Sequence, residues 1–255
     1  MIADRENGTD VRNRKILRVI IMINSRNLLT SALALLVGTT LFDASAGQGR
    51  AERGTVPATL KPVTTAETSP DAQGFIPRWV ILEPISIGDQ QRENASKAAV
   101  QKEYFPNQLT VLPHDGDKVT VDGKELTWHA VDTVDYNVNL YHFAADWNTT
   151  ANGALFWGVT IVNCPEEMQN VRLAIGSNAS SIWWVNGQEV VGIYGDIQTV
   201  VDDGVSKRLT LKKGPNVVRC AVINGSGASD FCARFLGPDD KPVKGFTVTL
   251  PDAAK

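Results

Sequence analysis

The chain has 255 residues, of which 43% are hydrophobic and 21% are charged, and its formal net charge is -3. This length and composition can fill the core of one domain, and we interpret the chain as one domain with tails. The weakly acidic net charge argues against the strongly basic surface that nucleic-acid-binding proteins use, so nucleic acid is not an expected partner.

Residues 1–46 are predicted to be a signal segment. An apolar run over 28–42 follows Arg26 and ends at an Ala-Ser-Ala sequence, residues 44–46, which fits a signal cleavage site. The run is shorter than the roughly 20 residues that span a bilayer, so no stable membrane span is expected after cleavage. The residues before Met22 are either an extended basic region or lie upstream of the true start. Because of the signal segment, we expect a secreted or periplasmic protein.

Residues 47–73 are predicted to form a flexible leader. They are rich in Gly, Pro, Thr and charged residues and lack apolar periodicity. The folded domain is expected over residues 74–251, and it begins with a strand at 79–85.

One helix is predicted, over residues 89–105. Asp89 can cap its first turn, and Pro106 ends it. The apolar positions that would share one helical face are Ala95, Ala98, Ala99 and Phe105.

Beyond Leu109 the pattern is one of short strands separated by turn residues, including a strand within residues 137–147. Such spacing predicts an all-β, antiparallel β-sandwich. Asn186-Gly187 in the sequence "SIWWVNGQEVV" indicates a tight hairpin turn. In the strand before that turn, Trp183 and Trp184 point to opposite faces, so one ring is expected to be buried and the other exposed.

Three cysteines do not form an even disulfide framework. If Arg219 faces solvent, Cys220 points inward, and if Arg234 faces solvent, Cys232 points outward. The two cysteines would then lie on opposite faces, which disfavours a disulfide between them. We therefore predict free thiols at Cys164, Cys220 and Cys232.

The catalytic motifs are sparse. No Gly-x-Ser-x-Gly sequence occurs, and the related segment 225–229 joins two strands. No His-x-x-x-His or Cys-x-x-Cys sequence supports a zinc site. An esterase would have to assemble its site from dispersed residues such as Ser177, Ser181 and His129.

An acidic region, "YGDIQTVVDDG", offers oxygen ligands that suit Ca²⁺. The candidate ligands are Asp196, Asp202 and Asp203. The alternative is that these side chains are simply solvated in a turn.

Six tryptophans are present, and most are expected in the core because each buries a large area. A sugar-binding site uses one or two exposed rings as stacking platforms, with polar side chains at the rim. The candidate platforms are Trp183, Trp184, Trp147 and Tyr194, with Asn186 at the rim.

Several stretches carry a resemblance to a known family, among them "RWVILEPI" (78–85), "SNASSIWWVNG" (177–187) and "LKKGPN" (211–216). They resemble the β-sandwich domain found with bacterial acetyl xylan esterases, which is similar to the galactose-binding-like modules of glycoside hydrolases. The resemblance covers roughly residues 75–250. It implies a jelly-roll sandwich and a link to xylan-type polysaccharide degradation, but it brings no catalytic domain.

The sequence thus predicts an exported, non-catalytic carbohydrate-binding sandwich that binds a polysaccharide or oligosaccharide and accompanies glycan-degrading enzymes. One alternative is an acetyl xylan esterase-type enzyme with a dispersed site. Another is a structural or protein-interaction sandwich of the cell envelope.

Overall fold

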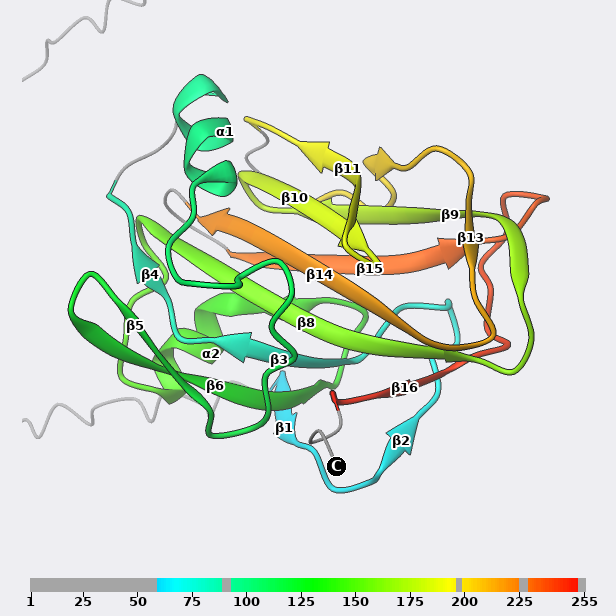
Figure 1. Ribbon diagram of the computed structural model, residues 1–255, viewed down its shortest axis with the longest axis horizontal. Coiled ribbons are helices and arrows are strands. Elements are labelled where there is room, and N and C mark those ends of the chain that lie inside the picture. The colour runs from blue at the N-terminus through cyan, green and yellow to red at the C-terminus, as the bar shows by residue number, and fades with distance from the viewer. Residues whose placement is uncertain (1–58, 89–92, 196–198, 225–228, 252–255) are drawn as a thin grey trace, which may run out of the picture. The chain divides into compact units, whose positions relative to one another are not determined.

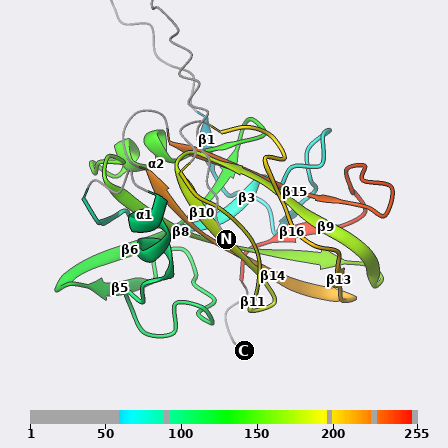
Figure 2. The ribbon, with the colours of Figure 1, turned by 90° about the horizontal axis from the view of Figure 1, so that it is seen from above.

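The computed structural model describes residues 59–88, 93–195, 199–224 and 229–251. Within these ranges two antiparallel sheets form a β-sandwich, so the predicted fold class is confirmed. Figure 1 shows the elements, and Figure 2 shows them after a 90° turn about the horizontal axis.

The larger sheet has eleven strands in the described part of the chain. They are β1 (Leu60–Pro62), β2 (Glu67–Thr68), β3 (Arg78–Leu82), β4 (Ile85–Ser86), β5 (Lys118–Val121), β6 (Lys124–Thr133), β8 (Ala154–Cys164), β10 (Ser180–Val185), β11 (Gln188–Ile193), β14 (Gly214–Asn224) and β16 (Thr247–Thr249). Its main order is β1-β6-β3-β8-β14-β10-β11. The long strands β8 and β14 therefore occupy its centre.

The smaller sheet and two helices complete the described fold. The strands of the smaller sheet are β7 (Val138–Asn139), β9 (Met168–Ser177), β12 (Gly204–Val205), β13 (Leu209–Leu211) and β15 (Asp230–Leu236). The helices are α1 (Glu93–Gln101) and α2 (Leu140–Asp146). Among the described residues, neither helix is long and apolar enough to cross a membrane.

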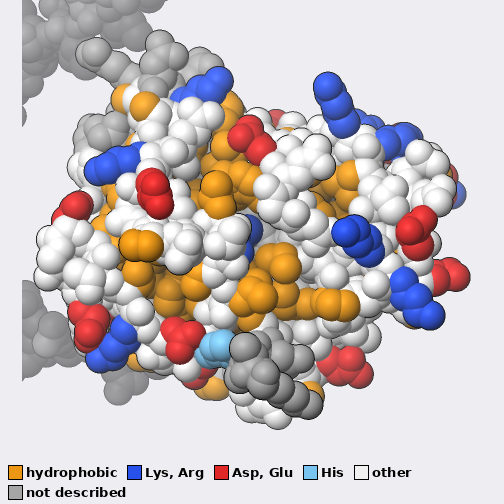
Figure 3. Space-filling view, in the orientation of Figure 1, with side chains coloured by type: hydrophobic (Ala, Val, Ile, Leu, Met, Phe, Trp, Pro, Cys, Tyr) orange, Lys and Arg blue, Asp and Glu red, His pale blue; other side chains and the backbone are white. Residues whose placement is uncertain are grey.

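The larger sheet is buried on both faces. Its inner face packs against the smaller sheet through one apolar cluster, which includes Trp79 and Trp183. Its outer face carries a second cluster, which includes Trp157 and Trp184 and is covered by α1 and the segment that follows it. Figure 3 shows apolar side chains in the middle of this outer face and charged side chains toward the rim.

This two-sided burial corrects the prediction for the paired tryptophans. Trp183 and Trp184 do point to opposite faces, but they are only 0% and 7% exposed. Trp183 packs edge-on against Trp79 with ring centroids 5.9 Å apart, and Trp184 stacks on Trp157 at 5.5 Å. The expectation of one exposed ring is wrong because both faces of β10 are covered.

Helix α1 differs from its prediction in length and facing. It runs only from Glu93 to Gln101, and Asp89 lies outside the described residues. Ser96 and Val100 are its buried positions, whereas Ala98 is exposed. The hydroxyl of Ser180 in β10 donates to Ser96 Oγ at 2.7 Å, which ties the helix to the larger sheet.

Helix α2 lies where the sequence predicts a strand. Asn139 caps it, because its side-chain oxygen accepts a hydrogen bond from the backbone N–H of His142 at 2.8 Å. Its buried residues are Leu140, Phe143 and Ala144, a spacing of three and four that belongs to a helix.

The sheet begins earlier than the predicted domain boundary at residue 74. Strands β1 and β2 both lie in the predicted leader, and β1 pairs with β6. Buried Arg78 makes two hydrogen bonds to the Asp132 carboxylate, at 2.7 and 2.9 Å. The same guanidinium donates to the backbone carbonyl and the hydroxyl of Thr65, which fixes the segment between β1 and β2.

Arg219 points to the outer face, as predicted, because Val218, Cys220 and Val222 of β14 lie in the cluster between the sheets, but Arg219 is buried there rather than exposed to solvent. Its guanidinium donates to the backbone carbonyls of Gln108 and Val111 at 3.1 and 2.7 Å. Those carbonyls belong to the segment that crosses the outer face after α1. Burial lowers the pKa of Arg219 to about 10.

All three cysteines are free and buried. Cys232 alternates with the core residues Phe231 and Ala233, so it points away from the core between the sheets, but it is still only 1% exposed. Burial raises the pKa of Cys232 to about 12 and also raises the pKa values of Cys164 and Cys220.

We predict that Trp184→Ala lowers the free energy of unfolding by about 3 to 5 kcal/mol, because it empties a filled position on the outer face. Trp147→Ala, at a position 43% exposed, is the matched control and should cost about 1 kcal/mol or less. Urea denaturation measures both. Equal losses in the two variants would contradict the burial of Trp184.

We also predict that the native thiols react slowly with an alkylating reagent at pH 8. Their raised pKa values leave the thiol protonated at that pH, and the thiolate is the reactive form. After denaturation without a reductant, titration should count three free thiols. A count below three, or rapid reaction of the folded protein, would contradict the arrangement.

Candidate functional site

Trp147 is the accessible tryptophan of the chain. All six tryptophans fall in described ranges, and the other five are buried. Trp147 follows the last residue of α2 and is 43% exposed. Its indole stacks on the imidazole of His129, with ring centroids 3.5 Å apart and planes 11° apart. One face of the indole is thereby covered, and the exposed area belongs to the rest of the ring.

The ring beneath Trp147 is itself held in place. His129 Nε2 lies 3.2 Å from Glu83 Oε1, and the other oxygen of Glu83 accepts a hydrogen bond from the backbone N–H of Thr127. The imidazole also packs edge-on against Phe143 of α2. These contacts hold His129 in place and thereby fix the orientation of the Trp147 ring in the absence of a ligand.

A hollow of about 410 Å³, here named the Trp147 cleft, is lined partly by the residues that follow Trp147 in the chain, although Trp147 itself is not part of its lining. Its lining residues are Pro84, Ser86, Lys124, Asn148, Thr149, Thr150, Asn152 and Ala154. The pairing of β4 with β8 sets Ser86 opposite Ala154, and Lys124 comes from the start of β6. The lining offers three hydroxyls, two carboxamides and one ammonium group. These are donors and acceptors that suit a ligand rich in hydroxyl groups.

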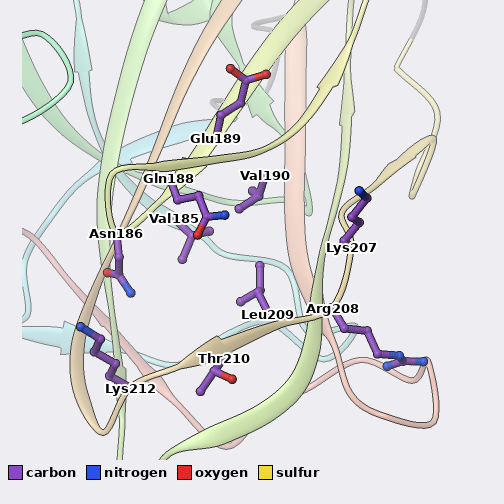
Figure 4. Close-up of a pocket in the computed structure, with 10 residues that line it drawn as sticks. All are labelled: Val185, Asn186, Gln188, Glu189, Val190, Lys207, Arg208, Leu209, Thr210 and Lys212. Atoms are coloured by element: carbon purple, nitrogen blue, oxygen red, sulfur yellow. The ribbon is translucent and has the colours of Figure 1, made fainter.

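A second hollow, the edge groove, lies between β11 and β13 and has a volume of about 680 Å³. Figure 4 shows its lining residues, which are Val185, Asn186, Gln188, Glu189, Val190, Lys207, Arg208, Leu209, Thr210 and Lys212. No aromatic ring is among them. Arg208 extends away from the others in Figure 4 and donates to the backbone carbonyl of Asn170 and to Asp240.

The other predicted sugar-binding residues do not join Trp147. Trp183 and Trp184 are buried, so neither offers a ring face to a ligand. The Asn186 carboxamide is engaged at both ends, since it donates to Asn216 and accepts from the backbone N–H of Val217.

Tyr194 borders neither hollow. The ammonium group of Lys97 in α1 lies 5.2 Å from its ring centroid, so the ring is directed toward the helix. Burial, with a smaller contribution from Glu189, raises the pKa of Tyr194.

The predicted calcium ligands are also dispersed. Both carboxylate oxygens of Asp202 accept hydrogen bonds from Arg234, and Asp203 is exposed. Asp196 lies outside the described residues. Within the described ranges, no group of three or more His, Cys, Asp or Glu residues is placed to hold a metal ion.

The residues of the alternative esterase site bind other partners. The Ser177 hydroxyl donates to Ser181 Oγ at 2.7 Å, and the indole N–H of Trp183 donates to the same oxygen at 2.9 Å. Both serines are buried, and His129 interacts with Glu83 and Trp147. These contacts do not connect a serine hydroxyl with an imidazole.

The sequence interpretation identified Trp147 but none of the residues that line the Trp147 cleft. One signal was present, because Trp147 is followed directly by the polar sequence "NTTAN", residues 148–152. Ser86 and Lys124 gave no such signal, since they reach the cleft only through strand pairing.

Comparisons with known proteins give a distant likeness. No protein-family model matches the chain, and no curated protein matches it. The chain is similar to part of a β-glucosidase from Kluyveromyces marxianus, with 15% identity and a TM-score of 0.39 over 70% of this chain and 20% of that one. It is also similar to part of the Ruminococcus gnavus β-glucuronidase, with 13% identity and a TM-score of 0.33 over 76% of this chain and 30% of that one.

The chain thus spans less than a third of the length of these enzymes. Identities and TM-scores this low do not establish a shared function. No family or curated match supports the resemblance to the domain of acetyl xylan esterases, which stays a prediction.

We predict that the melting temperature is the same in a chelator as in millimolar Ca²⁺. A cation at Asp202 would have to displace the Arg234 guanidinium from both carboxylate oxygens. Differential scanning fluorimetry makes the comparison. A rise in melting temperature with Ca²⁺, or a fall on chelation, would show that the acidic region binds a metal after all.

Proposed function

We propose that this chain is an exported, non-catalytic carbohydrate-binding β-sandwich, and that the Trp147 cleft is its glycan site. The observation that carries the proposal is the exposed Trp147 ring, held on His129 beside a hollow lined by polar side chains. In this role the protein accompanies enzymes that degrade xylan-type polysaccharides.

The chemistry of a sugar ring matches such a surface. A pyranose presents C–H groups on its faces and hydroxyls around its edge. An indole offers a large apolar face for the former, and convergent hydroxyl, amide and ammonium groups pair with the latter. Trp147 supplies the aromatic ring, and the cleft residues Asn148 to Asn152, which follow it directly in the chain, supply polar groups.

Preorganisation favours binding at this ring. Trp147 is packed on His129, which Glu83 holds in turn, so little side-chain freedom is lost when a ligand stacks on it. The edge groove lacks an aromatic platform, and its floor is built from Val185, Val190 and Leu209. Stacking therefore distinguishes the two hollows and favours the Trp147 cleft.

We predict that Trp147→Ala weakens glycan binding roughly 10- to 100-fold, the range of a binding hot spot. Xylan oligosaccharides and galactosides serve as probes, and isothermal titration calorimetry measures the affinity of each variant for them. Because the other five tryptophans are buried, acrylamide quenching of the native protein reports mainly on Trp147. A bound sugar should shield this ring and reduce quenching in proportion to occupancy.

Two variants serve as controls. Trp147→Phe keeps an aromatic face and should retain part of the affinity, whereas Gln188→Ala in the edge groove should leave it unchanged. Glycan binding that is lost in Gln188→Ala and kept in Trp147→Ala would refute the assignment of the site. Absence of shielding with every glycan tested would refute the function.

A further inference from the structure

A third hollow shares one lining residue, Ser86, with the Trp147 cleft. It has a volume of about 460 Å³ and is here named the Tyr104 pocket. Its lining residues are Ser86, Ile87, Ala95, Ala98, Ala99, Lys102, Tyr104 and Asp122. Ser86 is exposed at the end of β4 and borders both hollows.

The β5–β6 hairpin contributes to both hollows as well. Asp122 in its turn faces the Tyr104 pocket, and Lys124, two residues later, faces the Trp147 cleft. Asp122 has a φ of 48°, as the turn of this hairpin requires. The hairpin and β4, both at the left of Figure 1, thus form a common boundary for the two hollows.

Tyr104 is a second aromatic ring held in a fixed position. Its hydroxyl donates to the backbone carbonyl of Ala99 at 3.0 Å, and its backbone N–H donates to Gln108 Oε1 at 2.8 Å. The ammonium group of Lys102 lies 4.9 Å from the ring centroid. The ring is half-buried, and it meets a pocket whose other lining includes small alanine side chains and the Asp122 carboxylate.

We propose that the ligand is an extended oligosaccharide that runs from Trp147 across Ser86 to Tyr104. This inference rests on the proposed function and specifies its ligand class. Each hollow alone has the volume of a small-ligand site, and because Ser86 lines both, a chain of linked sugars that crosses Ser86 can occupy both. Two aromatic rings at separate positions then contact separate sugar units, and polar groups between them bind the hydroxyls.

The test compares xylobiose with xylohexaose by isothermal titration calorimetry. A ligand that reaches both rings gains affinity with length, and we expect the hexasaccharide to bind at least tenfold more tightly than the disaccharide. Tyr104→Ala should reduce the ratio of the two affinities toward one. Tyr104→Phe, which keeps the ring, should preserve most of it, and Trp147→Ala should weaken binding of both sugars.

A second variant tests the same pocket in case Tyr104→Ala does not fold. Ala98 is an exposed helix position that lines the Tyr104 pocket, so Ala98→Arg fills the pocket without disturbing the core. Ala98→Arg should also reduce the ratio of the affinities for xylohexaose and xylobiose. Gln188→Ala in the edge groove should leave this ratio unchanged. Melting curves confirm that each variant is folded.

The outcomes separate the two proposals. Suppose that both sugars bind through Trp147. If the hexasaccharide then binds no more tightly than the disaccharide, or if its advantage survives both Tyr104→Ala and Ala98→Arg, the extended path is wrong and the carbohydrate site stands. If neither sugar, nor any other glycan, binds, both proposals are wrong. A ratio that falls in both pocket variants and persists in Tyr104→Phe supports the path.

Discussion

The two-sided burial of the larger sheet is the constraint on which the rest of the structure depends. Strands β8 and β14 pair over their whole length, from Ala154 opposite Asn224 to Cys164 opposite Gly214, and their residues contribute to apolar clusters on both faces. Covering the outer face requires α1 and the segment after it, which Arg219 anchors through two backbone carbonyls. The same coverage buries five of the six tryptophans, so aromatic recognition is left to the margin of the sheet.

The sequence predicted those features that depend on local pattern. Turn residues and strand spacing gave the antiparallel sandwich, and the alternation of side chains in β10 correctly placed Trp183 and Trp184 on opposite faces. The errors arose where a distant segment decides exposure. Neither the cover over Trp184 nor the partners of Arg219 can be derived from the strand that holds these residues. The outer face is covered by α1 and the segment after it, and the Arg219 partners are the carbonyls of Gln108 and Val111.

The candidate site was predictable only in part for a similar reason. Trp147 was identified as an exposed aromatic candidate, and the polar residues that follow it mark a surface loop. Its support by His129 depends on the capped helix α2, which turns the chain where a strand was expected. Ser86 and Tyr104 join the same region through the pairing of β4 and the path of the chain after α1, which are tertiary features.

The sandwich thus buries five of its six indoles and presents one, that of Trp147, to solvent. Indole N–H resonances of ¹⁵N-tryptophan-labelled protein, titrated with xylohexaose, test this most directly. We expect the peak assigned through Trp147→Phe to move while the peaks of the five buried indoles stay nearly fixed. Movement of the Trp183 or Trp184 resonance with an unchanged Trp147 peak would contradict it.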